Sequence, residues 1–99
     1  MANEDPLFPS SLISPSIHAS LPGEFVCRPL QRSDFRHGHL AVLQDLAHVG
    51  NITEEQWTKR FDEMKKSNGT YFIVVFVDRR RKTERMIIGT GTLMVEKKL

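Results

Sequence analysis

Cysteine is almost absent from this 99-residue sequence. The single cysteine, Cys27, cannot form an internal disulfide or a cysteine-based metal site, and this favours a reducing, cytoplasmic setting. Cys27 lies in the apolar stretch 25–27. We interpret it as a buried strand residue rather than a nucleophile, because no catalytic partner can be placed beside it.

Long apolar runs and a strong charge of one sign are also missing. No stretch has the length of a membrane span, and the acidic start lacks the apolar core of a signal peptide. The net charge of +2 gives no indication of a nucleic-acid partner. Positive charge is concentrated only at residues 79–82, between two strand patterns, which we interpret as a solvated hairpin tip. An RNA-binding role for this run is a weaker alternative, because no aromatic residues are interleaved for base stacking.

Histidine spacing argues against a metal site. His37 and His39 are two residues apart and would diverge on a helix, while His18 and His48 are isolated. We therefore predict that the chain binds no metal, and no Ser/His/Asp or Cys/His set can be placed either. The glycines of the segment 89–92 do not form a phosphate loop, because such a loop joins a strand to a helix and no helix follows here.

The first 23 residues differ in composition from the rest. They hold four of the five prolines and many serines, without apolar periodicity. Such a segment buries too little surface to offset its ordering entropy, so we expect residues 1–23 to be a disordered leader. Residues 24–99 then form one small domain.

The remaining pattern predicts an α/β domain with the order strand, helix, helix, strand, strand. Residues 24–30 read as a strand, and Pro29 should lie at its end or on a sheet edge. A helix capped by Ser33 or Asp34 should run to about residue 47, weakened by Gly38. Residues 70–77 read as a strand buried on both faces, and residues 86–95 as its antiparallel partner.

The second predicted helix has the clearest start and stop signals. Thr53 and Gln56 fit a capping box, in which each side chain hydrogen-bonds to the backbone amide of the other residue. Trp57, Phe61 and Met64 fall on one face, which we interpret as core. Gly69 is placed to end the helix.

The last strand pattern runs almost to the end of the chain. Gly89 and Gly91 would share one face and leave room there, while Thr90 and Thr92 share the other. A long apolar edge strand is a liability that complete domains usually cover. We therefore interpret these residues as part of a domain truncated in its middle. The weak point should be strand 86–95, with its apolar residues Ile87, Ile88, Leu93 and Val95 partly exposed.

Three phrases, "RPLQRSDF", "LQDLAHVGNITEEQWTKRFDEMKKSNGTYFIVV" and "IIGTGTLMVEKKL", together with the order of elements, resemble glucosamine 6-phosphate N-acetyltransferase of the GNAT acetyltransferase superfamily. The resemblance covers most of the chain. It implies the N-terminal half of a GNAT-type fold with an antiparallel sheet, truncated before the acetyl-CoA loop. It also implies transfer of acetyl from acetyl-CoA to the amine of glucosamine 6-phosphate, in UDP-N-acetylglucosamine synthesis, by a homodimer.

The resemblance also assigns substrate-binding positions. Lys98 matches a lysine of the sugar-phosphate site, and an ammonium suits a phosphate. Leu99 matches the apolar residue beside it. Ala47 replaces a sugar-contacting threonine, which could weaken sugar binding by about 1 kcal/mol if a hydrogen bond is lost. No catalytic, cofactor-binding or metal-binding residue of the family falls within the 99 residues, so we expect an inactive fragment that binds no acetyl-CoA.

The alternative is a non-catalytic interaction module. Such a module would pair with a full-length subunit through its exposed sheet edge. The absence of the acetyl-CoA loop favours the module for this polypeptide, while ancestry favours the enzyme.

Overall fold

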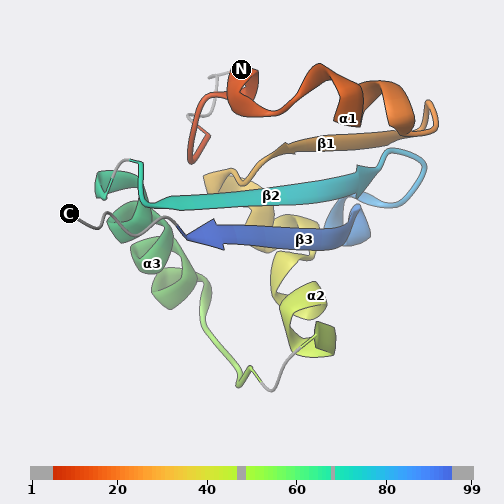
Figure 1. Cartoon of the computed structure of the whole chain (residues 1–99). Helices are drawn as coiled ribbons and strands as arrows, with labels where there is room; N and C mark the ends of the chain where they lie inside the picture. Colours follow the sequence, from red (N-terminus) through yellow and green to blue (C-terminus); the bar gives the residue numbers. More distant parts are fainter. Residues whose placement is uncertain (1–5, 47–48, 68, 95–99) are drawn as a thin grey trace.

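The centre of the computed structural model is an antiparallel sheet of three strands in the order β1-β2-β3 (Figure 1). The structure describes residues 6–46, 49–67 and 69–94. The strands are β1 Phe25–Pro29, β2 Tyr71–Asp78 and β3 Ile87–Met94. All three predicted strands and the antiparallel pairing of the last two are confirmed. Pro29 ends the edge strand β1, where its missing N–H interrupts no ladder.

The helices lie on the two sides of the sheet. Helices α2 (His39–Leu46) and α3 (Glu54–Lys66) lie on one face, and the N-terminal segment with α1 (Pro15–Ser20) lies over the other (Figure 1). Three short 3-10 turns complete the described chain: η1 Ser10–Leu12, η2 Arg32–His37 and η3 Thr83–Arg85. Within the described residues, no helix is both long enough and apolar enough to cross a membrane.

Helix α3 follows the sequence prediction closely. The Gln56 amide donates to Thr53 Oγ1 at 3.1 Å, and the Thr53 amide donates to Gln56 Oε1 at 3.0 Å, which is the predicted capping box. Trp57 and Phe61 are buried, and Met64 packs against them. Gly69 adopts the left-handed conformation just beyond the helix end.

The first predicted helix is not continuous. Gly38 has a φ of 99°, which separates η2 from α2, so the prediction of one helix from Ser33 or Asp34 was wrong. The first turn is capped from Gln31, with Asp34 at the third position. Glycine is required at position 38, since a Cβ there would lie 2.9 Å from the backbone oxygen of Glu84. Gly38 thus allows η2 to pack against the loop between β2 and β3.

The N-terminal segment, for which the sequence predicts a disordered leader, packs against the sheet from residue 6 onward. Leu7, Phe8 and Ile13 are buried in the core cluster, and the Phe8 ring meets Phe72 edge-on at 5.3 Å between centroids. The Leu7 amide also donates to the Leu30 oxygen at 2.8 Å. These three apolar side chains cover a sheet face that would otherwise be exposed. Residues 1–5 lie outside the described part.

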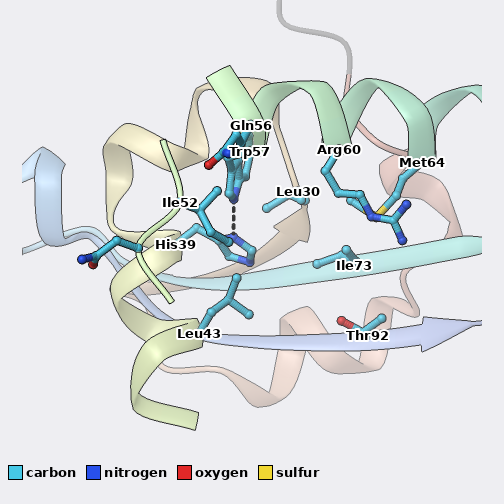
Figure 2. Close-up of a pocket in the computed structure, with 11 residues that line it drawn as sticks. Leu30, His39, Leu43, Ile52, Gln56, Trp57, Arg60, Met64, Ile73 and Thr92 are labelled. Atoms are coloured by element: carbon cyan, nitrogen blue, oxygen red, sulfur yellow. Dashed lines mark hydrogen bonds between the residues drawn. The ribbon is translucent and has the colours of Figure 1, made fainter. Parts of the chain in front are cut away.

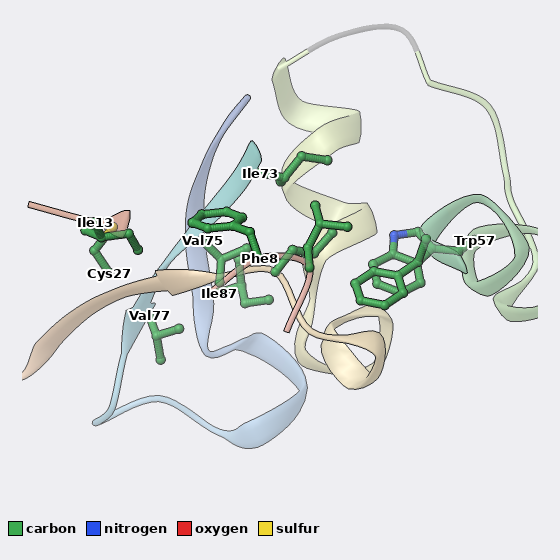
Figure 3. Close-up of a cluster of buried hydrophobic side chains, with 11 residues drawn as sticks. Phe8, Ile13, Cys27, Trp57, Ile73, Val75, Val77 and Ile87 are labelled. Carbon is green, nitrogen blue, oxygen red and sulfur yellow. The ribbon is translucent and has the colours of Figure 1, made fainter. Parts of the chain in front are cut away.

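The core follows from strand alternation. In β2, Ile73, Val75 and Val77 are buried (Figure 3) and point toward the helices. Phe72, Val74 and Phe76, on the other face, are only partly buried. Burial on both faces of β2 is therefore only partly confirmed. Cys27 is a buried residue of β1, as predicted, and burial raises the pKa of its thiol.

Strand β3 forms the other edge of the described sheet. Thr90 pairs with Val75 and Thr92 with Ile73, so the two threonines share the helix-covered face, as predicted. Leu93 is 62% exposed and Ile88 is exposed as well, but Ile87 is buried, so its predicted exposure was wrong. Val95 lies outside the described residues.

The hairpin tip between β2 and β3 is exposed, as the sequence predicted for residues 79–82. Arg80 folds back onto Asp78, its Nε donating to Oδ1 at 3.0 Å and its Nη2 to Oδ2 at 3.1 Å. Its guanidinium also lies over the Phe25 ring. One of the four basic side chains is thus paired within the hairpin.

Candidate functional site

A cavity of about 570 Å³ lies between the sheet and the helices α2 and α3 (Figure 2). This volume falls in the range of small-molecule sites. Its walls come from both helices, from the segment joining them and from the strand ends: Leu30, His39, Leu43, Asn51, Ile52, Gln56, Trp57, Arg60, Met64, Ile73 and Thr92. A second hollow of about 720 Å³, under the N-terminal segment, has no charged side chain among its lining residues.

A chain of hydrogen bonds starts at the buried His39. Trp57 Nε1 donates to His39 Nδ1 at 3.2 Å (Figure 2), and His39 Nε2 lies 3.3 Å from Thr90 Oγ1. Thr90 Oγ1 in turn donates to the Val74 backbone oxygen at 2.9 Å. Because the indole can only donate and the threonine proton is already used, His39 must accept at Nδ1 and donate at Nε2. The network therefore selects one neutral tautomer.

Burial favours the same neutral form. His39 is 3% exposed, and this burial lowers the pKa of its imidazole, while the charge of Asp34 acts in the opposite direction. Protonation at Nδ1 would remove the acceptor that the Trp57 indole uses. His39 therefore fixes α2 to α3 and β3 as a neutral, fully bonded group.

The unfolding free energy should consequently fall in mild acid. The pKa of His39 is lower in the folded chain than the unfolded value of about 6.5, so its contribution is complete above about pH 6.5 and is lost as pH falls toward the folded pKa. The slope from this one group can reach about 1.4 kcal/mol per pH unit. Urea unfolding at pH 7.5 and 5.5 measures it. His39→Gln should reduce the slope, while His18→Gln, on the exposed face of α1, should not. Equal slopes in wild type and His39→Gln would contradict the assignment.

Next to the cavity, a buried ion pair anchors η2 to β1. Arg28 Nη1 and Nη2 donate to the two oxygens of Asp34, each at 2.8 Å. The Gln31 amide and His37 Nδ1 add bonds at 2.8 and 3.0 Å. Burial by itself would raise the pKa of the Asp34 carboxyl, but the hydrogen bonds from Arg28 and His37 and the charge of Arg28 lower it overall. The carboxylate is thus held ionised with four donors.

This arrangement can bind and orient a ligand. Both nitrogens of His39 are engaged, and the described residues that line the cavity include no other general base. The described residues contain no group of three or more His, Cys, Asp or Glu side chains that could hold a metal ion.

The site residues predicted from the sequence, Ala47, Lys98 and Leu99, all lie outside the described residues. Sequence reasoning missed His39, which it considered only as a metal ligand paired with His37. It also missed the Arg28–Asp34 pair, although both residues lie in a phrase that carried the resemblance. Gln31 and Asp34 do form a capping box, but a glutamine followed by an aspartate is not the usual pairing of Ser or Thr with Glu or Gln, so no standard pattern marks Asp34 in the sequence.

Comparisons with known proteins point in one direction, although no family model matches the chain. The chain is 42% identical over 86 residues to the probable glucosamine 6-phosphate N-acetyltransferase of Drosophila melanogaster, covering 85% of this chain and 37% of that protein. It is 42% identical over 71 residues to glucosamine 6-phosphate N-acetyltransferase 1 of Dictyostelium discoideum, covering 72% of this chain and 43% of that protein. The chain spans half or less of the length of the curated relatives it matches.

A solved structure agrees with these relatives. The crystal structure of glucosamine-6-phosphate N-acetyltransferase from Arabidopsis thaliana matches with a TM-score of 0.66 at 34% identity, over 75% of this chain and 48% of that chain. The predicted fold class, the N-terminal half of a GNAT-type fold with an antiparallel sheet, is therefore confirmed.

Proposed function

We propose that these 99 residues are the N-terminal portion of a glucosamine 6-phosphate N-acetyltransferase. Such an acyltransferase moves acetyl from acetyl-CoA to the amine of glucosamine 6-phosphate, in the cytoplasmic route to UDP-N-acetylglucosamine. The observation that carries the proposal is 42% identity over 85% of the chain to the probable glucosamine 6-phosphate N-acetyltransferase of Drosophila melanogaster. The fold match to the enzyme from Arabidopsis thaliana supports it.

Within that enzyme, these residues would supply scaffold and one border of the sugar site. Lys98 would attract the phosphate as a point charge, and Leu99 and Ala47 would border the sugar ring. The network of Trp57, His39 and Thr90 would hold the helices and the sheet in register. A second subunit, as in a homodimer, would complete the assembly.

The reaction itself needs more than these residues hold. Attack of the amine on the thioester calls for loss of an amine proton and a donor to the developing oxyanion. The matched segment covers 37% of the Drosophila melanogaster protein and 43% of the Dictyostelium discoideum protein, so each of these relatives is more than twice as long as its matched segment. We expect a polypeptide made of these 99 residues alone to show no sugar-dependent release of coenzyme A, and acetyl-CoA to act only as the co-substrate of a full-length protein.

A chimera tests the proposal. Residues 1–99 are joined to the second half of the Arabidopsis thaliana enzyme, and thiol release is measured with acetyl-CoA and glucosamine 6-phosphate. The folded chimera should turn over, whereas the 99-residue polypeptide should not. Lys98→Ala should raise the KM for the sugar phosphate, while Lys97→Ala should leave it unchanged. A chimera with a cooperative thermal transition but no sugar-dependent thiol release would overturn the proposal.

A second candidate is the interaction module. It is favoured by one observation, the position of β3 at the edge of the described sheet with Leu93 and Ile88 exposed. A strand of a full-length subunit could add to that edge. Sedimentation of the polypeptide mixed with a full-length relative distinguishes the two, because only the module should form a stable mixed species.

A further inference from the structure

Among the described residues that line the cavity between α2, α3 and the sheet, Arg60 is the one with a permanent charge. Its guanidinium lies over the Tyr71 ring, 5.5 Å from the centroid, which holds the side chain at the cavity wall. Glu63 is its nearest ion-pair partner, with Oε1 at 3.7 Å from Nη1, too far for a hydrogen bond. The part of the chain that the structure describes gives this guanidinium no hydrogen-bond acceptor.

The cavity around Arg60 has two distinct ends. At one end the indole of Trp57 and the side chains of Leu43 and Ile52 form an apolar wall, with neutral His39 behind it (Figure 2). At the other end, Arg60 lies with Met64 and Ile73 (Figure 2). The described residues that line the cavity include no carboxylate, and Glu63, which pairs with the guanidinium at 3.7 Å, is not among them. Its wall is mostly apolar, with the neutral polar side chains of Asn51, Gln56 and Thr92 among the lining residues and one positive charge, Arg60, near one end.

We propose that this cavity binds a small organic anion that has a compact apolar body and one carboxylate. The apolar body would displace water from the wall beside Trp57, and the carboxylate would accept from the N–H groups of Arg60. A guanidinium matches a carboxylate in a bidentate geometry, which fixes the orientation of the ligand. The volume of about 570 Å³ admits a substituted benzoate or a molecule of similar size.

This binding is independent of acetyl transfer. A largely apolar anion without a phosphate is unlike a sugar phosphate, whose several hydroxyl groups each need a polar partner, and most of the described lining residues are apolar. The ligand would occupy the space between the helices and the sheet. It would thereby stabilise the helix-covered face, since a ligand that binds only the folded chain raises its stability.

Trp57 provides a reporter at the cavity wall, since it is the only tryptophan in the chain. Its indole N–H gives a single cross-peak in a ¹H–¹⁵N correlation spectrum of the 99-residue protein. The probes are 4-tert-butylbenzoate and the neutral 4-tert-butylbenzamide, which have the same apolar body. The proposal expects a saturable shift of the indole peak with both, and binding of the carboxylate about five- to tenfold tighter, as one charge-assisted hydrogen-bonded contact allows.

Two variants assign the preference to Arg60. Arg60→Gln should abolish the preference for the carboxylate over the amide, while the neighbouring Lys59→Gln, exposed on α3 and absent from the cavity wall, should keep it. Both residues are exposed, so both variants should fold. The proposal is overturned if neither probe gives a saturable shift at millimolar concentration, if acid and amide bind equally in the wild type, or if Arg60→Gln retains the preference.

Discussion

Replacing Asp34 with alanine is expected to lower the unfolding free energy by about 3–5 kcal/mol, because it leaves a largely buried guanidinium without its partner. The Asp34 side chain has 0% exposure and accepts from Arg28, Gln31 and His37. Without it, those donors lose acceptors inside the protein, and η2 loses its link to β1. A domain has only about 5–15 kcal/mol in total, so this change should unfold much of the population.

Asp62→Ala is the matched control. Asp62 also pairs with an arginine, Arg32, but both side chains are about half exposed, so its loss should cost about 1 kcal/mol or less. Urea unfolding of both variants at pH 7 measures the difference. A loss below about 1 kcal/mol for Asp34→Ala would show that water replaces the carboxylate, contrary to its burial.

The Arg28–Asp34 pair also makes the unfolding free energy depend on pH in acid. Because the folded pKa of Asp34 lies below its unfolded value, its contribution is complete above about pH 4 and disappears as pH falls through the folded pKa. It therefore acts at lower pH than His39. The loss of stability in acid should begin below about pH 6.5 and deepen below about pH 4.

Local signals in the sequence predicted the elements that depend on near neighbours. The capping box of Thr53 and Gln56 involves residues three apart, and the placing of Thr90 and Thr92 on one face of β3 involves residues two apart. Both interactions are decided within a few residues, so a pattern reveals them. The strand bounds were correct to within one residue for the same reason.

Features that depend on distant neighbours were not predicted. Gly38 divides the first helix because the backbone of Glu84, 46 positions away in sequence, occupies the space of a side chain. Leu7, Phe8 and Ile13 are buried against the apolar far face of the sheet, although their own segment has no periodicity. The prediction for residues 1–23 weighed their composition against the entropy cost of ordering them. It did not include the apolar sheet face that these side chains cover, because composition does not show where that face lies.

The residues of the candidate site show the same difference between features set by near neighbours in sequence and features set by distant ones. A spacing argument excluded His37 and His39 as a metal pair, but it could not place His39 against Trp57 and Thr90, which lie on two other elements. Arg60 was not distinguished in sequence from the other basic residues of α3. Its position over Tyr71 and beside the cavity separates it from Lys59 only in three dimensions.

Phe61→Ala should have an effect of similar size to Asp34→Ala, about 3–5 kcal/mol, through packing rather than charge. Phe61 is 2% exposed, and its ring stacks on Trp57 with an angle of 11° and 5.8 Å between centroids. Truncation would leave a void directly behind the indole that lines the cavity. Trp57 should then lose its fixed position, and its hydrogen bond to His39 should weaken.

Phe61→Leu and Leu93→Ala separate packing from simple loss of apolar area. Leucine fills much of the same volume and should cost less than alanine at position 61, because the cavity term is smaller. Leu93 is largely exposed at the sheet edge, so its truncation should change stability by about 0.5 kcal/mol or less. Urea unfolding followed by Trp57 fluorescence gives the free energies, and the native emission of Phe61→Ala should shift to the red as water reaches the indole. An unchanged native emission together with a small loss of stability would mean that α3 closes over the void, and that the position of Trp57 is held by His39 rather than by Phe61.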